Sequence, residues 1–287
     1  SAYAPSRSYV TGETRDGAYA LLRDRILPGL VGRSFQSYAD VRTFLMNCDG
    51  KAPADWVEPE VPQAAAWCAV DLALLDAFGR AFSQSVFAAG RYDIRCSGVL
   101  AGGPKARYAR SCLLFRLYGL RQVKMKVGWD GNLAALRRVR KLLGGGTDLR
   151  VDANMGWSVE QAAGIMRDMS RLGVRSFEQP VAADALDAMA RLVRDTGLAV
   201  MADESFTDRR SLQRLIEKRA CTAVNVRISK CGGLTASLQR CREARDAGLT
   251  LQAGCQVGES SLLSAAQLAL LSWLRPVEYV EGCFGRH

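Results

Sequence analysis

The chain repeats a short strand-forming run followed by a helical stretch, and it does so eight times from Asp93 onward. The runs occupy residues 93–99, 122–127, 148–151, 174–177, 198–202, 223–226, 249–253 and 277–280. Successive runs start 24 to 29 residues apart. Eight evenly spaced strand and helix units predict an α/β fold, a parallel (β/α) barrel of the TIM type that closes on itself. A doubly wound open sheet is the alternative, which the regularity of the units disfavours.

The first 92 residues lack this alternation and contain helical candidates at residues 17–30 and 63–82. The second candidate is very apolar, as expected for a helix that packs against another body of the protein. We therefore expect two domains. Residues 1–92 form a partial, mostly helical N-terminal capping region, and residues 93–287 form the barrel that carries the active site.

Composition describes a soluble globular protein, with 48% apolar and 24% charged residues among 287. No apolar run approaches the roughly 20 residues of a membrane span, and the first residues lack the apolar core of a signal peptide. Nine cysteines without a C-x-x-C pair favour buried free thiols, so we expect a cytoplasmic protein. The only histidine is His287, which argues against Ser-His-Asp catalysis and against a multi-histidine metal site.

The formal net charge is +10, yet the arginines are spread over many predicted helices. No dense basic tract is interleaved with aromatic residues, so we expect no nucleic-acid partner and no membrane partner. An excess of positive charge agrees with a small anionic substrate, although it does not identify one.

The stretch "QVKMKVG" places Lys124 and Lys126 on one face of a predicted strand, because successive side chains of a strand point to opposite faces. If the strand is central, both ammonium groups enter one enclosed space. Burial and mutual repulsion would then favour a neutral amine that can act as a base, with one lysine helping to hold the other neutral. An edge strand with a solvated lysine face is the alternative.

Charged residues follow the next strands at the same interval. The steps from Lys126 to Asp152, Glu178, Asp203 and Lys230 are 26, 26, 25 and 27 residues. Since the C-terminal strand ends of such a barrel hold its active site, these five side chains are expected to form an arc around the barrel mouth. Three carboxylates on adjacent strands need a cation between them, and an all-oxygen ligand set suits Mg²⁺, with Mn²⁺ as the nearest rival.

Each residue also has a simpler interpretation. Asp152 and Asp203 are common helix N-cap residues, and Glu178 can be an ordinary loop residue. Lys230 precedes two glycines whose amides could form an anion site with it. Glu204 is expected to orient a lysine or a metal ligand without itself binding the metal. The pattern across five consecutive strands favours the catalytic interpretation.

With these motifs the chain resembles the enolase superfamily, in particular its muconate-lactonizing (muconate cycloisomerase) subgroup. The resemblance rests on "KMK", "VDAN", "FEQP", "ADES" and "SKCGG", in that order, together with "GCQVGESS" near the seventh strand. It implies a modified, enolase-like barrel in which Asp152, Glu178 and Asp203 hold Mg²⁺. It also implies that Lys126 and Lys230 face opposite sides of the substrate's α-carbon, with Lys124 in support. Further neighbours of the site by this resemblance are Asn154, Asn225 and Glu259.

The chain departs from the family pattern. We expect it to start after the family's antiparallel N-terminal sheet and to stop before the C-terminal segment, where specificity loops normally lie. Dipeptide epimerases carry Asp-x-Asp on strand eight, where this chain has "VEYVEGCFG", so a dipeptide substrate is disfavoured. The strand-seven histidine of the mandelate-racemase subgroup is missing.

The leading functional hypothesis is a Mg²⁺-dependent isomerase that removes the α-proton of a carboxylate through an enediolate. It would be a cycloisomerase or a racemase or epimerase of acylated amino acids. A lyase of the o-succinylbenzoate synthase type is the alternative, and a Schiff-base lysine aldolase on the same barrel is a third hypothesis. A barrel that binds an anion without catalysis is the non-enzymatic one. By family expectation the protein is a homo-oligomer acting on a small carboxylate.

Overall fold

The computed structural model describes residues 12–282, apart from residues 92, 102–104, 129–131 and 257. Its eight strands form one sheet in chain order, and all neighbouring strands are parallel. They are β1 (Gly98–Leu100), β2 (Gln122–Lys126), β3 (Asp148–Asp152), β4 (Val174–Glu178), β5 (Ala199–Ala202), β6 (Ala223–Val226), β7 (Thr250–Ala253) and β8 (Tyr279–Val280).

The two ends of the sheet meet, because a parallel bridge joins Cys96 to Val280. The Ser97 N–H also donates to the Val280 carbonyl oxygen at 2.8 Å. The predicted TIM-type barrel is thus confirmed. The first strand begins later than predicted, at Gly98, since residues 93–97 meet β8 only through this bridge.

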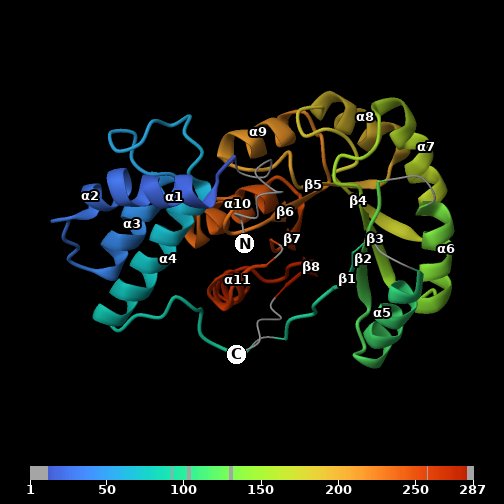
Figure 1. The fold of residues 1–287 in the computed structure, drawn as a ribbon, viewed down its shortest axis with the longest axis horizontal. Helices are drawn as coiled ribbons and strands as arrows, with labels where there is room; N and C mark the ends of the chain where they lie inside the picture. The colour runs from blue at the N-terminus through green and yellow to red at the C-terminus, as the bar shows by residue number, and fades with distance from the viewer. Residues whose placement is uncertain (1–11, 92, 102–104, 129–131, 257, 283–287) are drawn as a thin grey trace.

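A helix follows each of the first seven strands, and these helices lie outside the sheet (Figure 1). They are α5 (Lys105–Leu117), α6 (Asn132–Leu143), α7 (Val159–Ser170), α8 (Leu186–Thr196), α9 (Arg209–Glu217), α10 (Leu234–Asp246) and α11 (Ser261–Trp273). Local signals set their limits. Asp208 and Ser211 form a capping box at the start of α9, and Gly197 ends α8 in the left-handed conformation at φ 66°.

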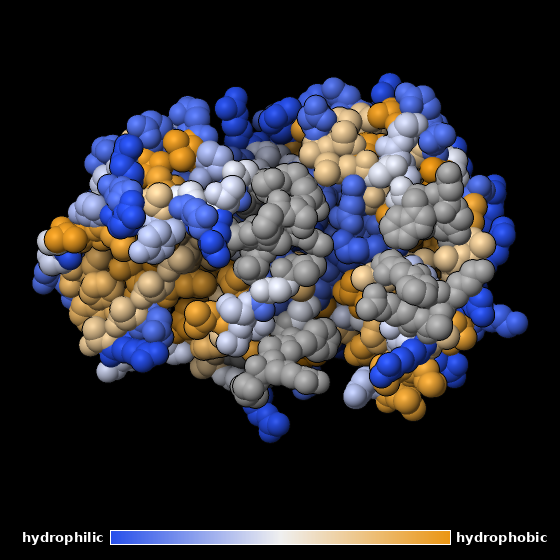
Figure 2. Space-filling model, viewed as in Figure 1, coloured by the Kyte–Doolittle hydropathy of each residue, from blue (hydrophilic) through white to orange (hydrophobic). Residues whose placement is uncertain are grey.

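The region before the barrel is helical over the residues that the structure describes, as predicted. It consists of α1 (Arg15–Leu21), a π-helical turn η2 (Leu22–Ile26), α2 (Leu27–Leu30), α3 (Tyr38–Cys48) and α4 (Ala64–Ala81). Figure 1 shows these helices gathered beside α10, and α3 and α4 both contact α10. Figure 2 shows apolar side chains exposed over the part of this region where Figure 1 draws α3 and α4.

One hydrophobic core runs from Ala18 in α1 to Leu274 after α11, so packing is continuous between the helical region and the barrel. Within the described ranges, no helix is both long enough and apolar enough to cross a membrane. Eight cysteines are described and all are free thiols, as predicted, but only five of them are buried, because Cys48, Cys96 and Cys255 are partly exposed. The ninth cysteine, Cys283, and the histidine His287 lie outside the described residues.

Candidate active site

The predicted site residues lie at the C-terminal ends of their strands. Lys126 and Asp152 are paired in register across β2 and β3, and Asp152 is paired with Glu178 across β3 and β4. Asp203 directly follows β5, and Lys230 lies in the turn that follows β6. All of these residues are buried except Lys126, whose side chain is 26% exposed. The expected arc around the barrel mouth is present.

Lys124 lies among three carboxylates inside the barrel. Its Nζ is 2.7 Å from Glu281 Oε2, 3.1 Å from Glu178 Oε2 and 3.5 Å from Asp152 Oδ2. Burial alone would lower the pKa of this lysine, but the attraction of Glu178, Glu281 and Asp152 outweighs burial and raises it well above the usual range. A charged Lys124 agrees with the supporting role that was expected for it. Its influence on Lys126 stays a prediction.

Lys126 is held by an asparagine of the next strand's loop. Its Nζ donates to Asn154 Oδ1 at 2.8 Å and lies 3.5 Å from Asp152 Oδ2. The Asn154 amide donates in turn to Glu204 Oε1 at 3.2 Å. Burial, followed by repulsion from Asp152, raises the pKa of Glu204. The predicted neighbours Asn154 and Glu204 therefore form a chain of hydrogen bonds that ends on Lys126.

Lys230 is enclosed on the opposite side of the barrel. Its Nζ donates to the Asp203 backbone oxygen at 2.6 Å, to Asp203 Oδ1 at 2.7 Å and to the Asn225 backbone oxygen at 3.2 Å. Burial and the nearby Arg227 guanidinium lower the pKa of Lys230 to about 7. An amine with such a pKa exchanges a proton near neutral pH.

Glu178 is the most heavily bonded carboxylate of the site. Besides Lys124, it accepts from the Asn225 amide at 2.8 Å and from the Gln252 amide at 3.1 Å. Burial would raise the pKa of Glu178, but the positive charges of Lys124, Arg227 and Arg150 outweigh burial and lower it to about 2. This group is therefore ionised at neutral pH, and Asn225 belongs to its direct surroundings.

Glu259 stands apart from this cluster. It lies in the loop after β7 and accepts a hydrogen bond from the Gln256 N–H of the same loop at 2.7 Å. Burial raises the pKa of Glu259. The structure thus places it beside the seventh strand, as predicted, but its bond is local to its own loop.

Several charged residues of the site escaped the sequence analysis. Arg150 donates to Ser97 Oγ at 2.8 Å, lies 3.4 Å from Glu281 Oε1, and stacks 3.9 Å above the Tyr279 ring. Arg227 forms an ion pair with Asp203. The positions of Arg150 and Glu281 in the sequence could have identified these two as site residues. Arg150 is two residues before Asp152 on the same strand face, and Glu281 is the first charged residue after the eighth strand.

The three carboxylates offer only oxygen donor atoms, the ligand type that a hard divalent cation prefers. Two of these oxygens are buried and meet only cationic side chains: Asp152 Oδ2 lies 3.5 Å from the Nζ atoms of Lys124 and Lys126, and Asp203 Oδ2 pairs with Arg227. Cationic side chains nevertheless lie on the same carboxylates, namely Lys124, Arg227 and Lys230. In this arrangement the described residues contain no group of three or more acidic, cysteine or histidine side chains placed to hold an ion.

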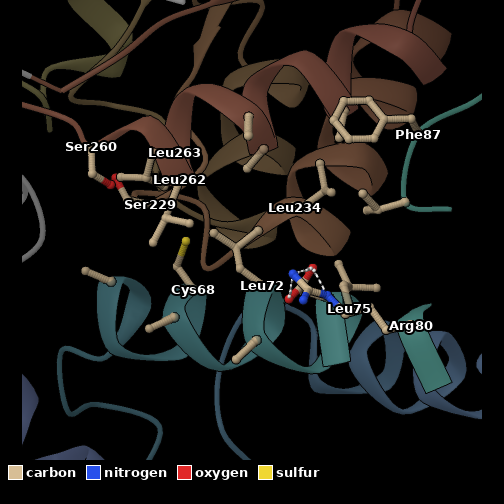
Figure 3. A pocket seen from close by; sticks show the side chains of 18 residues that line it. Cys68, Leu72, Leu75, Arg80, Phe87, Ser229, Leu234, Ser260, Leu262 and Leu263 are labelled. Atoms are coloured by element: carbon tan, nitrogen blue, oxygen red, sulfur yellow. Dashed lines mark hydrogen bonds and ion pairs between the residues drawn. The ribbon is translucent and has the colours of Figure 1, made fainter. Parts of the chain in front are cut away.

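A separate apolar pocket of about 500 Å³ lies between α4 and the start of α10 and α11 (Figure 3). Leu72, Leu234 and Leu263 line it, and Ser229 and Ser260 lie at one end. None of the predicted catalytic or metal-binding residues lines this pocket. The charged residues that line it, Asp76 and Arg80, pair with each other on α4 at 3.1 Å, so we place the chemistry at the barrel mouth and not here.

Comparison with known proteins agrees with the barrel and its motifs. A family model described as "Enolase C-terminal domain-like" matches residues 107–287. The chain is 29% identical over 265 residues to an N-succinyl-L-Arg/Lys racemase of Bacillus cereus, covering 90% of this chain and 69% of the relative. It is 30% identical over 279 residues to a chloromuconate cycloisomerase of Cupriavidus necator, covering 94% and 72%.

A solved structure is similar over the same extent. The crystal structure of the N-succinyl Arg/Lys racemase from Bacillus cereus superposes with a TM-score of 0.82 at 27% sequence identity. The match covers 96% of this chain and 73% of that one. The helical region and the barrel therefore share their arrangement with this structure.

Proposed function

Because the chain belongs to the family of enolase C-terminal domain-like proteins, we propose that it is an isomerase that moves the α-proton of a carboxylate substrate with Lys126 and Lys230. One observation carries this proposal. The strands β2 and β6 are four positions apart in an eight-stranded barrel, so the two lysines approach the mouth from opposite walls. A lysine on each side of an α-carbon can remove a proton from one face and return one to the other.

The residues around the lysines support different roles for them. Lys230, with a pKa of about 7, is partly neutral near pH 7 and can accept a proton. Lys126 is held in place by its 2.8 Å hydrogen bond to Asn154. Lys124 stays charged among its carboxylates and supports the site electrostatically without exchanging a proton.

We further propose that Asp152, Glu178 and Asp203 hold Mg²⁺, or Mn²⁺ in its place. The all-oxygen ligand set at the ends of three adjacent strands supports this assignment. When bound, the ion would stabilise the negative charge that develops on the substrate carboxylate as the α-proton leaves. The chain's own lysines would carry the proton.

The substrate class that we propose is an N-acylated amino acid. Relatives include an N-succinyl-L-Arg/Lys racemase. A dipeptide substrate, by contrast, carries a free ammonium group, for which an acidic side chain is a suitable partner. The strand-eight carboxylate of this chain, Glu281, is already paired with Lys124 at 2.7 Å and lies 3.4 Å from Arg150. A substrate without an ammonium group suits that arrangement better. Muconate-like acids are the second class, as in the cycloisomerase relative.

We propose that residues 1–92 are the capping region and residues 93–287 the catalytic barrel domain. A homo-oligomer is expected from the family. A cytoplasmic location is supported by the free thiols of the described cysteines.

Proton NMR in D₂O tests the function directly. N-succinyl-L-lysine, N-succinyl-L-arginine and L-Ala-L-Glu would be incubated with enzyme and Mg²⁺, and the α-proton signal followed. With cis,cis-muconate, which has no acidic α-proton, the appearance of a lactone would be followed instead. We expect exchange with an N-succinyl amino acid, lost in Lys126→Ala or Lys230→Ala and after EDTA treatment. Lys218→Ala, which changes an exposed lysine on the outer surface, is the matched control. Undiminished exchange in both active-site variants would refute the proposal.

The products distinguish the alternative reactions. Elimination of a leaving group from the same deprotonated substrate, as in an o-succinylbenzoate synthase, would give a new alkene signal in place of simple exchange. A Schiff-base aldolase would be trapped covalently by borohydride with a carbonyl substrate, and mass spectrometry would locate the adduct on Lys126 or Lys230.

A further inference from the structure

The turn that carries Lys230 is enclosed between the barrel and the N-terminal helical region. Every residue from 223 to 237 is buried, a stretch that includes β6, the turn and the first part of α10. A catalytic side chain on a loop is only as well placed as the groups that fix the loop. The groups that fix this one come from far away in the sequence.

The helix after this turn, α10, is not capped by its own residues. Its N-cap position is Gly233, which has no side chain. Asp71 of α4 takes over this role, because its Oδ2 accepts from the Leu234 N–H at 2.7 Å and from the Thr235 N–H at 3.3 Å. Asp71 is 1% exposed. A buried carboxylate on a helix N-terminus satisfies amides that would otherwise lack a partner.

The glycines of the turn allow this close approach. A Cβ atom on Gly233, where φ is 120°, would lie 2.6 Å from the Asp71 side chain. On the other side, a Cβ atom on Gly50 would lie 2.5 Å from the Cys231 backbone oxygen. The α3–α4 connection and α4 itself thus press against the turn from two sides. Both contacts lie within three residues of Lys230.

A third contact binds α10 to the helical region at its second turn. Arg240 of α10 is 1% exposed and donates to the Asp49 backbone oxygen at 3.3 Å, and it also pairs with the Asp49 carboxylate. Asp49 directly precedes Gly50. The start of α10 and its second turn are therefore both tied to the helical region.

We propose that Asp71 is a positioning residue for Lys230, so that α4 fixes one of the two proton-transferring lysines. This inference rests on the proposed function for its catalytic consequence. Its mechanism is local: Asp71 anchors the amides of Leu234 and Thr235, the turn between Lys230 and Leu234 keeps its shape, and the amine stays beside Asp203. Lys126, on the opposite wall, does not depend on this anchor.

Hydrogen–deuterium exchange tests the local part without requiring a substrate. In Asp71→Ala we expect amide exchange of residues 231–236 to rise about tenfold, the size expected for loss of a helix cap. Peptides from β3 and β4 should be unchanged. Asp71→Asn keeps an acceptor oxygen and should restore protection. Asp76→Ala removes an exposed carboxylate from the same helix and is the matched control. Unchanged exchange at 231–236 in Asp71→Ala would overturn the proposal.

Stereochemistry tests the catalytic part and separates it from a general loss of stability. Lys126→Ala and Lys230→Ala first show which enantiomer of N-succinyl-lysine exchanges its α-proton through which lysine. Asp71→Ala should then slow the Lys230-dependent exchange about tenfold relative to the Lys126-dependent one, with Asp71→Asn close to wild type. Equal slowing of both enantiomers would contradict the positioning role. A wild-type protein that exchanges neither enantiomer would contradict the proposed function instead, while hydrogen exchange still decides the anchor.

Discussion

Asn154 is the residue that fixes Lys126, and the backbone there has an unusual conformation. Asn154 and Met155 have φ angles of 45° and 63°, in the left-handed region that non-glycine residues seldom adopt. The Asn154 N–H donates to Asp152 Oδ1 at 3.1 Å, which holds the turn in this form. Such strained conformations gather at functional sites, where surrounding bonds keep them in place.

Replacing Asn154 by alanine should therefore impair one lysine selectively. A hydrogen bond to a charged group is worth about 1.5–3 kcal/mol, so the Lys126-dependent exchange should fall by about tenfold to a hundredfold in kcat. The change in KM should be smaller, because the substrate's contacts are not removed. Stereospecific exchange in D₂O measures the effect. Asn47→Ala on the exposed side of α3 is the control. Equal loss for both enantiomers would contradict this role of Asn154.

The buried ion pairs of Lys124 should contribute to the stability of the fold. Lys124→Met leaves Glu178, Glu281 and Asp152 buried without their shared ammonium group, and breaking a buried ion pair in this way costs about 3–5 kcal/mol of unfolding free energy. Adding Glu281→Gln should recover part of that loss, because it removes one of the stranded charges. Urea denaturation of the two single variants and the double variant measures the coupling. Strictly additive losses would contradict a direct interaction.

The sequence analysis found the site residues that repeat once per strand, because the spacing of Lys126, Asp152, Glu178, Asp203 and Lys230 follows the repeat itself. It missed residues whose importance depends on contacts across the barrel. Arg150 is an ordinary strand residue in the sequence, yet in the structure its guanidinium meets Ser97, Gln252 and Glu281. The charge state of Lys124 also needed the structure, since only the three surrounding carboxylates reverse the effect of burial.

At the scale of the elements, α4 and α10 are joined through a buried acid whose titration can be followed. Burial raises the pKa of Asp71 from 3.8 to about 6, although the hydrogen bonds from Thr235 and Leu234 oppose the rise. The titratable groups that sense its charge are Tyr38, Cys48 and Cys68. The folded protein thus binds the Asp71 proton more tightly than the unfolded chain does.

This difference predicts how stability changes with pH. Between pH 3.8 and 6 the folded state holds more protons than the unfolded state, so this group's contribution falls as pH rises. The loss should approach about 3 kcal/mol above pH 6, while Asp71→Asn has no such loss. Denaturation of both proteins at pH 4 and pH 7 gives the comparison. Wild type should lose stability relative to the variant over this interval, and a constant difference would contradict the raised pKa.

The elements themselves were predictable where hydrophobic periodicity and end signals agree. The strands from residue 122 to residue 253 lie close to their predicted positions, because a helical stretch separates each short apolar run from the next. The sequence analysis missed α3, although Ser37 caps it through the Asp40 N–H and Asp49 ends it in the left-handed conformation. Those two end signals, Ser37 and Asp49, could have located the eleven residues of α3.

At the scale of the whole molecule, the helical region and the barrel share one core and meet at α10, so each stabilises the other. This relation could not be read from the sequence, because it depends on contacts between residues as distant as Asp71 and Leu234. The amide and carboxylate of that contact carry no local sequence signature. The fold class could be predicted because it follows from a sequence repeat. The way in which the two regions join could not, because it depends on individual polar contacts.

Binding of a metal ion should stabilise the entire chain, because an ion that binds only the folded state adds its binding free energy to that of folding. If Asp152, Glu178 and Asp203 hold Mg²⁺, a concentration about a hundred times the dissociation constant would add about 2.7 kcal/mol. Each kcal/mol raises Tm by about 2–4 °C in a protein of this size class. Calorimetry with Mg²⁺ and with EDTA should therefore show a rise of several degrees. Asp203→Asn should abolish the rise, and Asp187→Asn, on the exposed surface, should not.

If Mg²⁺ does not raise Tm, the three carboxylates serve the ion pairs of the site and not a metal ion. Lys124 and Arg227 already pair with the three carboxylates in this structure, so a chain that relies on these cations alone gains nothing from the ion. An unchanged Tm at saturating Mg²⁺ and Mn²⁺ would then assign the carboxylates to the ion-pair network. Since Lys124 competes for the same oxygens, Lys124→Met should in that case lower Tm with or without the ion. If the ion does bind, it should restore part of the stability that Lys124→Met removes.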